Sequence, residues 1–249
     1  MRYKYVKEQE DYSDLASGRV FHSLPGHPAF PVRLAREIFQ RCMASRNSIY
    51  KNSSRCVLYD PCCGAAYHLS VLVTLHRESI QEVIGSDIDE KAVALAKRNL
   101  ELTSVAGLDQ RIDEITTMSH LYGKTSHQDA LQSAQKLRSQ AFALSQKYPV
   151  RMGVFRANAT DRKDILTKLQ AKSVDIVFTD IPYGQHSNWY DSELASPTWS
   201  MLDALKGTLS NSSLVAIASN KQQKVSHDHY QRIDQFQVGK RRIVILMPI

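Results

Sequence analysis

The stretch VLYDPCCGAAYHL, residues 57–69, leads from an apolar run into a helical pattern through a turn that contains Asp60, two cysteines and Gly64. A turn at the carboxyl end of a parallel strand is where α/β sheets bind ligands, because the first N–H groups of the following helix are unpaired. A glycine there lets a ligand approach the backbone. These residues alone leave three interpretations open: a metal site, a reactive thiol or a small-molecule site.

Further apolar runs of strand length occur along the chain. After CVLY (56–59) they are EVIGSD (82–87), VRMGVF (150–155), VDIVFTD (174–180), LVAIAS (214–219) and IVILM (243–247). Helical patterns separate most of these runs, which is typical of a parallel sheet in an α/β domain. No helical pattern separates the last two runs, so we expect the final strand to enter the sheet antiparallel to its neighbours.

A helical pattern also precedes the first strand. Residues 31–45 place apolar side chains on one half of a helical wheel and Arg33 and Arg36 on the other half, which predicts an amphipathic helix with a basic outer face. We therefore divide the chain into a basic helical extension, residues 1–54, and a ligand-binding domain, residues 55–249. Together they should form one compact unit.

The gap between the second and third predicted strands is too long for a single helix. We expect one helix over residues 89–102, with Asp89 as its N-cap, and two more helical segments within residues 103–149. The second of these segments begins with Thr125 and Gln128 in capping-box spacing. We interpret residues 103–149 as a helical insertion that serves either substrate recognition or structural support.

Composition limits the class of protein. A chain of 249 residues, 43% of them hydrophobic, can form one large packed domain. It has no run of about 18 apolar residues and no apolar segment at its start, so we expect a cytoplasmic protein without a membrane span. Four cysteines, two of them adjacent, fit reduced thiols better than a disulfide framework. The net charge of +7 gathers in residues 19–55 and 221–242, which favours a polyanionic partner.

The end of the second predicted strand indicates the kind of ligand. Asp87 lies 27 residues beyond Asp60, and a carboxylate at this point can accept hydrogen bonds from both hydroxyls of a ribose. The three-glycine fingerprint of a dinucleotide site is absent, because residues 64–69 read GAAYHL. Asp60 repels phosphate and favours a cationic or zwitterionic ligand. S-adenosylmethionine, with an ammonium, a sulfonium and a ribose, meets these demands.

The fourth predicted strand ends in TDIPYG, residues 179–184. Asp180 and the carbonyl of Ile181 can accept hydrogen bonds from an amino group of a planar base, while Tyr183 stacks on its ring. Because the lone pair of such a nitrogen is delocalised, two acceptors that orient it and stabilise its developing positive charge favour methyl transfer. The alternative is a turn that merely ends a strand.

The spacing of the cysteines and histidines supports neither a reactive thiol nor a metal. A nucleophilic Cys62 or Cys63 needs a basic partner, and His68 lies inside the predicted helix with no evident orienting geometry. The nine histidines show no metal-ligand spacing, and HDH at 227–229 more often marks a polar loop. We expect packing roles for the cysteines and no metal.

Taken together, these motifs resemble a known family. SLPGHPAFPVRLAREIF, DPCCGAAYHL followed by VTLHR, the SDID strand end, the insertion opening with AGL and the TDIPYG turn resemble the AviRa family of avilamycin-resistance ribosomal RNA methyltransferases. The similarity runs from about residue 23 to near the C-terminus. It implies a Rossmann-like class I methyltransferase fold, with a mostly parallel sheet of the seven-stranded type and an antiparallel last strand. It also implies methylation of a guanine in large-subunit rRNA and, through it, resistance to orthosomycins of the avilamycin type.

The resemblance also implies roles for single residues. It assigns Asp60, Cys62 and Gly64 to the methionine end of the cofactor and Asp87 to its ribose. It places Asn158 or Asp161 near the adenine. The residues that it assigns to the target base are Asp180, Ile181, Pro182 and Tyr183. The chain departs from the family pattern at Ala65 and Ala66, where the family has Ser-Gly or a close equivalent. The second alanine adds a methyl group beside the cofactor and restricts the backbone.

A further set of residues are candidates for RNA binding. His27 and Phe30, on a proline-rich loop, either stack on an unpaired base or pin the N-terminal segment to the domain. The remaining candidates are Arg33, Arg36, Trp189, Arg241 and Arg242. We predict a monomer that binds large-subunit rRNA. The alternatives are a DNA or protein-amide N-methyltransferase, and a non-catalytic RNA-binding module with a degenerate cofactor fold.

Overall fold

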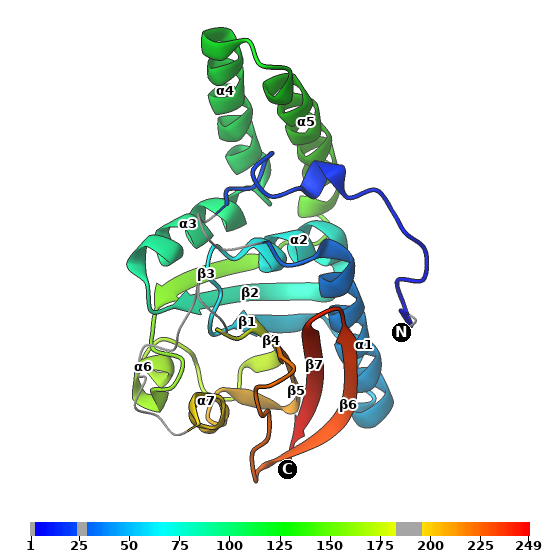
Figure 1. Cartoon of the computed structure of the whole chain (residues 1–249), viewed down its shortest axis with the longest axis vertical. Coiled ribbons are helices and arrows are strands. Elements are labelled where there is room, and N and C mark those ends of the chain that lie inside the picture. The colour runs from blue at the N-terminus through cyan, green and yellow to red at the C-terminus, as the bar shows by residue number, and fades with distance from the viewer. Residues whose placement is uncertain (1–2, 24–28, 183–195) are drawn as a thin grey trace.

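The structure, a computed structural model, describes residues 3–23, 29–182 and 196–249. At its centre lies a seven-stranded sheet with the order β3-β2-β1-β4-β5-β7-β6 (Figure 1). The strands are β1 (Cys56–Asp60), β2 (Ile80–Asp87), β3 (Arg151–Arg156), β4 (Val174–Asp180), β5 (Leu209–Asn220), β6 (Tyr230–Val238) and β7 (Arg241–Pro248). Strands β1 to β5 are parallel, whereas β7 lies between β5 and β6 and is antiparallel to both. The predicted α/β class and the antiparallel last strand are confirmed.

Strand β6 is absent from the prediction. Its sequence, YQRIDQFQV, has no apolar run, and only Tyr230 and Phe236 are buried in it. The strand ends the sheet order, so it pairs with β7 on one side and much of it faces solvent. An edge strand of this kind needs few apolar residues, which is why hydrophobic pattern alone did not reveal it.

Helices cover both faces of the sheet. The core on one face includes side chains of α1 (Val32–Tyr50), α2 (Tyr67–His76) and α3 (Glu90–Glu101), and the core on the other face includes side chains of α6 (Arg162–Leu166) and α7 (Pro197–Leu205). Consecutive strand residues alternate between the two cores, so Leu58 packs toward α1 and Tyr59 toward α6. Within the described ranges, no helix is both long enough and apolar enough to cross a membrane.

The predicted insertion is a helical hairpin that projects from the sheet (Figure 1). It consists of α4 (Val105–Tyr122) and α5 (Thr125–Ser145), so the two predicted helical segments are confirmed. Asp89 caps α3 as predicted, accepting a hydrogen bond from the Lys91 N–H at 2.9 Å. The capping box at Thr125 is wrong: Lys124 is the N-cap of α5, and no side-chain hydrogen bond caps that helix. The chain needs only two residues to turn from α4 into α5, so Thr125 already lies inside the helix.

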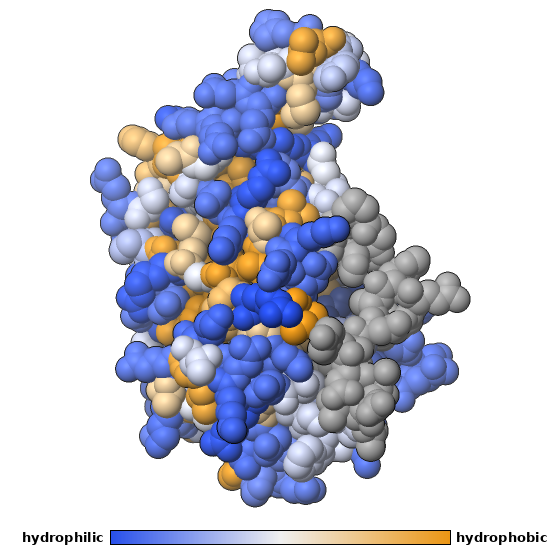
Figure 2. All heavy atoms as spheres, turned by 90° about the vertical axis from the view of Figure 1, so that its left-hand side faces the viewer, coloured by the Kyte–Doolittle hydropathy of each residue, from blue (hydrophilic) through white to orange (hydrophobic). Residues whose placement is uncertain are grey.

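The base of the hairpin holds the N-terminal segment. The short helix η1 (Ser13–Leu15) packs on α5, where Asp14 accepts hydrogen bonds from Lys136 and, at 2.8 Å, from Ser133. Arg111 of α4 donates to the carbonyl of Val20 at 3.0 Å. These contacts support the structural interpretation of the insertion. Its outer end carries exposed apolar side chains, which are visible at the top of Figure 2; Leu121 and Tyr122 belong to this end.

The polar side of α1 is not an outer face, so that prediction is wrong. Glu37 is fully buried and accepts hydrogen bonds from the N–H groups of residues 4–6 and from Arg41. Arg33 donates to carbonyls of the same N-terminal segment, and Arg36 pairs with Glu10 at 2.6 Å. A helical wheel separates polar from apolar positions but cannot show that another segment of the chain covers the polar side.

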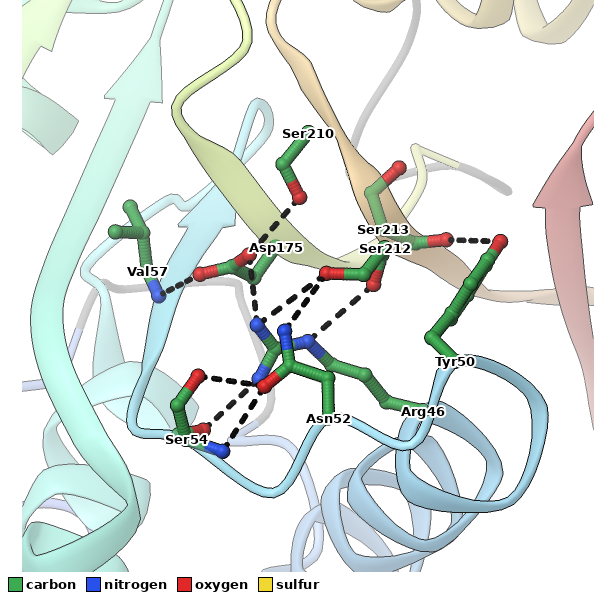
Figure 3. A network of polar contacts seen from close by, with 9 residues as sticks. All are labelled: Arg46, Tyr50, Asn52, Ser54, Val57, Asp175, Ser210, Ser212 and Ser213. Carbon is green, nitrogen blue, oxygen red and sulfur yellow. Dashed lines mark hydrogen bonds and ion pairs between the residues drawn. The ribbon is translucent and has the colours of Figure 1, made fainter.

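A buried ion pair joins α1 to the amino ends of the parallel strands (Figure 3). Arg46, which is 2% exposed, lies 2.9 Å from Asp175 of β4 and donates to the carbonyl of Ser54 at 2.9 Å. Asp175 also accepts a hydrogen bond from the N–H of Val57 in β1, at 2.9 Å. This network therefore holds α1, β1 and β4 together at the sheet edge opposite the turn that follows Asp60.

Candidate functional site

Hydrogen bonds donated by backbone N–H groups fix the turn between β1 and α2. The pairs are Cys62 N to Asp60 Oδ1 (2.9 Å), Cys63 N to Ser86 O (2.8 Å), Gly64 N to Asp87 Oδ2 (2.9 Å) and Ala66 N to Cys63 O (2.7 Å). The turn is therefore bound to the end of β2 as well as to itself. Gly64 adopts φ +53°, and among the described residues a Cβ there would meet nothing within 4 Å, so these residues leave the space beside it open.

Ala66, where the family pattern has glycine, also has a positive φ, of 51°, and is fully buried at the start of α2. A left-handed conformation costs an L-residue about 1–2 kcal/mol. The alanine at this position therefore adopts a backbone conformation that is unfavourable for any residue other than glycine.

The two predicted carboxylates of the cofactor site differ in exposure. Asp87 is partly buried at the end of β2, where its oxygens accept from the N–H groups of Gly64 and Asp89. Burial raises the pKa of Asp87, and its oxygens have further lone pairs for the hydroxyls of a ribose. Asp60 is 0% exposed, so it shapes the turn from inside the protein and does not itself face solvent.

A pocket opens at the carboxyl ends of β1 and β4. One wall is the turn at residues 62–65, and the N-terminal segment forms the opposite wall with Ser17, His22 and Phe30. Asp180 also lines it. Burial lowers the pKa of His22 to about 4, so this side chain is neutral at pH 7. The structure thus brings the predicted residues Cys62, Gly64 and Asp180 to one pocket.

The predicted adenine residues follow β3, which is next to β2 in the sheet. Asn158 accepts hydrogen bonds from the N–H and hydroxyl of Thr160, at 3.0 and 2.9 Å. Asp161 caps α6 by accepting from the Lys163 N–H at 2.8 Å. Both side chains shape their own turn, and neither belongs to the pocket described above. Their role toward an adenine stays a prediction.

The turn after β4 is anchored by the two residues that follow Asp180. The N–H of Ile181 donates to the carbonyl of Ala218 in β5 at 3.1 Å, and the Pro182 carbonyl accepts from Gln223 at 2.9 Å. Arg241, at the start of β7, lies with its Nε 3.6 Å from Asp180 Oδ2. Tyr183, His27 and Trp189 lie outside the described residues.

The charge pattern assigned Arg241 to RNA, whereas the structure places it against the predicted catalytic carboxylate. Its guanidinium also lies over the ring of Phe30, 5.2 Å from the centroid. Phe30 is 5% exposed and packs on Phe178 at 5.5 Å. A buried ring cannot stack on a base, so of the two interpretations of Phe30 the structure favours the one in which it pins the N-terminal segment.

The structure also identifies a site residue that sequence reasoning dismissed. His68 Nε2 lies 3.1 Å from Asp60 Oδ2, and its ring packs between Phe30 and Phe178. The expectation that His68 has no orienting partner is wrong. The two residues lie on opposite sides of the turn, so the pairing depends on how the turn folds back.

A second missed residue, Asn99, connects the two walls of the pocket. From α3 it donates to the carbonyl of Ala65 at 2.8 Å and to that of His22 at 3.0 Å, and it accepts from the His22 N–H at 2.7 Å. Asn99 is fully buried. A buried asparagine within a helical pattern was a possible signal, because such a side chain needs partners.

The cysteines of the turn behave as packing residues. Burial, followed by the Asp60 and Asp87 carboxylates, raises the pKa of both the Cys62 and the Cys63 thiol well above the ordinary value. Both thiols therefore remain protonated at neutral pH and are poor nucleophiles.

The side chain of Cys63 packs against Gly85 of β2, where a larger residue has no room. A Cβ at Gly85 would lie 2.9 Å from Cys63 Sγ, whereas a Cβ at Gly153, in the adjacent strand β3, would meet nothing within 4 Å. We expect Gly85→Ala to lower the free energy of unfolding by about 1–3 kcal/mol through overpacking. The matched variant Gly153→Ala should change it by less than about 0.5 kcal/mol. Urea titration of both variants tests this, and equal effects would show that the contact is unimportant.

A mostly parallel sheet with this strand order, and a pocket beside a glycine turn at its carboxyl edge, define a Rossmann-like methyltransferase fold. The chain belongs to the AviRa family, because the family model described as rRNA methyltransferase AviRa matches residues 1–241. The 23S rRNA (guanine(2535)-N(1))-methyltransferase of Streptomyces viridochromogenes is 36% identical over 244 residues, covering 98% of this chain and 95% of the relative.

Two solved structures of the rRNA methyltransferase aviRa from Streptomyces viridochromogenes have the same fold. One, at 2.4 Å, matches with a TM-score of 0.86 and 36% identity over 98% of this chain and 96% of the other. The second, at 1.5 Å, matches with a TM-score of 0.87 and 35% identity over 99% and 96%. Both matches extend over the hairpin and the N-terminal segment, which are therefore part of the family fold.

Proposed function

We propose that this protein transfers the methyl group of S-adenosylmethionine to a guanine of large-subunit rRNA, at N1 as in the relative's name. The observation that carries the proposal is the pocket that brings the glycine turn and Asp180 together. A cofactor held against the turn and a base held by Asp180 would meet there.

The residues present fit this cofactor. The open space at Gly64 allows a ligand to approach the backbone, and Asp87 retains acceptor capacity for a ribose. The turn at residues 62–65, together with Ser17 and His22 of the N-terminal wall, would hold the methionine part. When bound, S-adenosylmethionine supplies an electrophilic methyl group.

The chain's own contribution is to hold and deprotonate the base. Guanine N1 carries a proton that must leave when the nitrogen is methylated, and the Asp180 carboxylate is positioned in the pocket to accept it. The carbonyl of Ile181 would accept a hydrogen bond from the neighbouring amino group. Arg241, with its Nε 3.6 Å from Asp180 Oδ2, helps to hold that carboxylate in place.

The RNA would approach over the carboxyl edge of the sheet, with the target base turned out of its stack. Exposed Lys221 and Lys240 lie at the end of β5 and before β7, next to the strand ends that carry Asp180 and Arg241. They can contact the surrounding phosphates. The RNA-binding roles of His27, Arg33, Arg36, Trp189 and Arg242 stay predictions, as do the monomeric state and the cytoplasmic location.

Radioactive transfer tests the function. The protein and tritiated S-adenosylmethionine are incubated in separate reactions with unmodified 23S rRNA, assembled large subunits, DNA and ribosomal proteins. We expect label in one guanine of the rRNA or of the subunit, released as 1-methylguanine on hydrolysis. Label in DNA or protein would establish the alternative N-methyltransferase. No cofactor binding at all would favour the non-catalytic RNA-binding module with a degenerate cofactor fold, whereas cofactor binding without transfer would indicate that a particle or partner is missing from the assay.

The same assay extends to resistance. Ribosomes that carry the modified guanine should bind avilamycin-type orthosomycins more weakly than unmodified ribosomes, because a methyl group displaces the ligand's contacts. Equal affinity of the two ribosome populations for the antibiotic would show that the methylation does not cause resistance.

A further inference from the structure

His68 is a buried histidine in the first turn of α2, and its ring lines the pocket. Its Nε2 lies 3.1 Å from Asp60 Oδ2 and 3.4 Å from the carbonyl oxygen of Phe178. The rings of Phe30 and Phe178 hold the imidazole, with centroid distances of 5.6 and 4.8 Å. His68 is 6% exposed and Asp60 is 0% exposed, so the pair is withdrawn from water.

A carboxylate without contact to water is costly unless a positive charge and hydrogen bonds compensate it. Asp60 Oδ1 accepts from the N–H of Cys62, and Oδ2 faces His68. Burial by itself would lower the pKa of His68, but the hydrogen bond to Asp60 and the nearby Asp180 carboxylate outweigh it and raise that pKa. These neighbours therefore favour the imidazolium more than water does.

We propose that His68 is a positioning residue for the cofactor turn: its Nε2 holds Oδ2 of Asp60, and Asp60 held in this orientation accepts the Cys62 N–H through Oδ1. The turn that carries Gly64 then keeps the shape that a cofactor meets. The inference rests on the proposed function, because it requires S-adenosylmethionine to bind against this turn. If His68 only filled the aromatic cluster, its charge would be irrelevant to binding.

The pH dependence follows from the groups around the ring. These are the carboxylates of Asp60 from β1 and Asp180 from β4 and, through Phe30 and Asp180, the guanidinium of Arg241 from β7; Cys62 and Cys63 line the same pocket. Because the pKa of His68 is raised on folding, its stabilisation of the turn is complete below the ordinary value of 6.5. It is lost as pH rises through the raised value, so cofactor affinity should fall there.

The first variant is His68→Phe, which keeps an aromatic ring but removes the charge. Calorimetric titration with S-adenosylmethionine should show affinity about tenfold weaker at pH 6 and a flat pH profile in place of the wild-type decline. The matched control is His76→Phe on the same helix. The His76 ring packs at a tilt against Phe39, with 5.2 Å between the centroids, and burial lowers the pKa of His76 to about 4. The control should leave affinity and profile unchanged. Wild-type affinity and profile in His68→Phe would overturn the proposal.

A double-mutant cycle tests whether the pair acts as a unit. Asp60→Asn alone should weaken cofactor binding. The double variant with His68→Phe should lose no more affinity than the single variant with the larger loss. Additive losses of affinity would overturn the proposal. If these variants do not fold, nuclear magnetic resonance of the wild-type histidines decides the matter. A charged His68 at pH 7 supports the proposal, and a neutral one contradicts it. A wild-type protein that binds no S-adenosylmethionine would refute the proposed function instead, without changing the measured charge of His68.

Discussion

Replacing Asp180 by asparagine should lower the rate of methyl transfer by about 10²–10⁴-fold, the usual contribution of a group that accepts a proton in the transition state. Asparagine retains the shape and one acceptor oxygen but cannot take the N1 proton. Cofactor affinity should change far less than the rate, because the hydrogen bonds that fix the turn at residues 62–65 do not involve this carboxylate, which acts on the turn only indirectly, through the pKa of His68. Single-turnover transfer to 23S rRNA and calorimetric cofactor binding measure the two quantities separately.

The same change also removes the negative charge that faces Arg241, so a control must separate the two effects. Arg241→Gln removes the ion pair at 3.6 Å but leaves the carboxylate in place. It should cost transfer much less than Asp180→Asn, because the acceptor of the proton remains. Losses of equal size in transfer and in cofactor binding for Asp180→Asn would contradict the role that we assign to Asp180.

Arg46→Ala should be among the most destabilising single changes, lowering the free energy of unfolding by about 3–5 kcal/mol. The variant leaves Asp175 without its cation and the carbonyl of Ser54 without its donor, and it removes an Arg46 side chain that is almost fully buried. Urea denaturation followed by circular dichroism measures the change. Lys51→Ala, an exposed position at the end of the same helix, is the control and should stay within about 0.5 kcal/mol of the wild type.

Adding Asp175→Asn to Arg46→Ala tests the cause of this loss. The double variant should recover part of the stability, because the unpaired carboxylate and not the lost side-chain packing accounts for most of the cost. Cofactor affinity of the folded protein should remain, since the ion pair lies at the amino ends of β1 and β4 and the pocket lies at their carboxyl ends. No recovery in the double variant would assign the loss to packing.

Much of the fold was predictable because it depends on neighbours in sequence. Alternation and apolar runs located six of the strands, and the cap at Asp89 follows from residues two positions apart. Strand β6 escaped because an edge strand needs few apolar residues, and the capping box at Thr125 failed because the turn before α5 is shorter than the motif assumes. Motifs at strand ends located Cys62, Gly64 and Asp180, since parallel strands end at the same edge of a sheet.

By itself, the amino-acid sequence determined the α/β class, the helical insertion, the glycine turn and the acidic turn after β4, because each is a pattern of consecutive residues. Only the tertiary structure decided which distant groups meet. The strand order places β7 beside β5, and this brings Arg241 to Asp180; the fold of the turn brings His68 to Asp60; and α3 lets Asn99 join the two walls of the pocket. Such pairings arise from packing across the sheet and its helices, and no local periodicity encodes them.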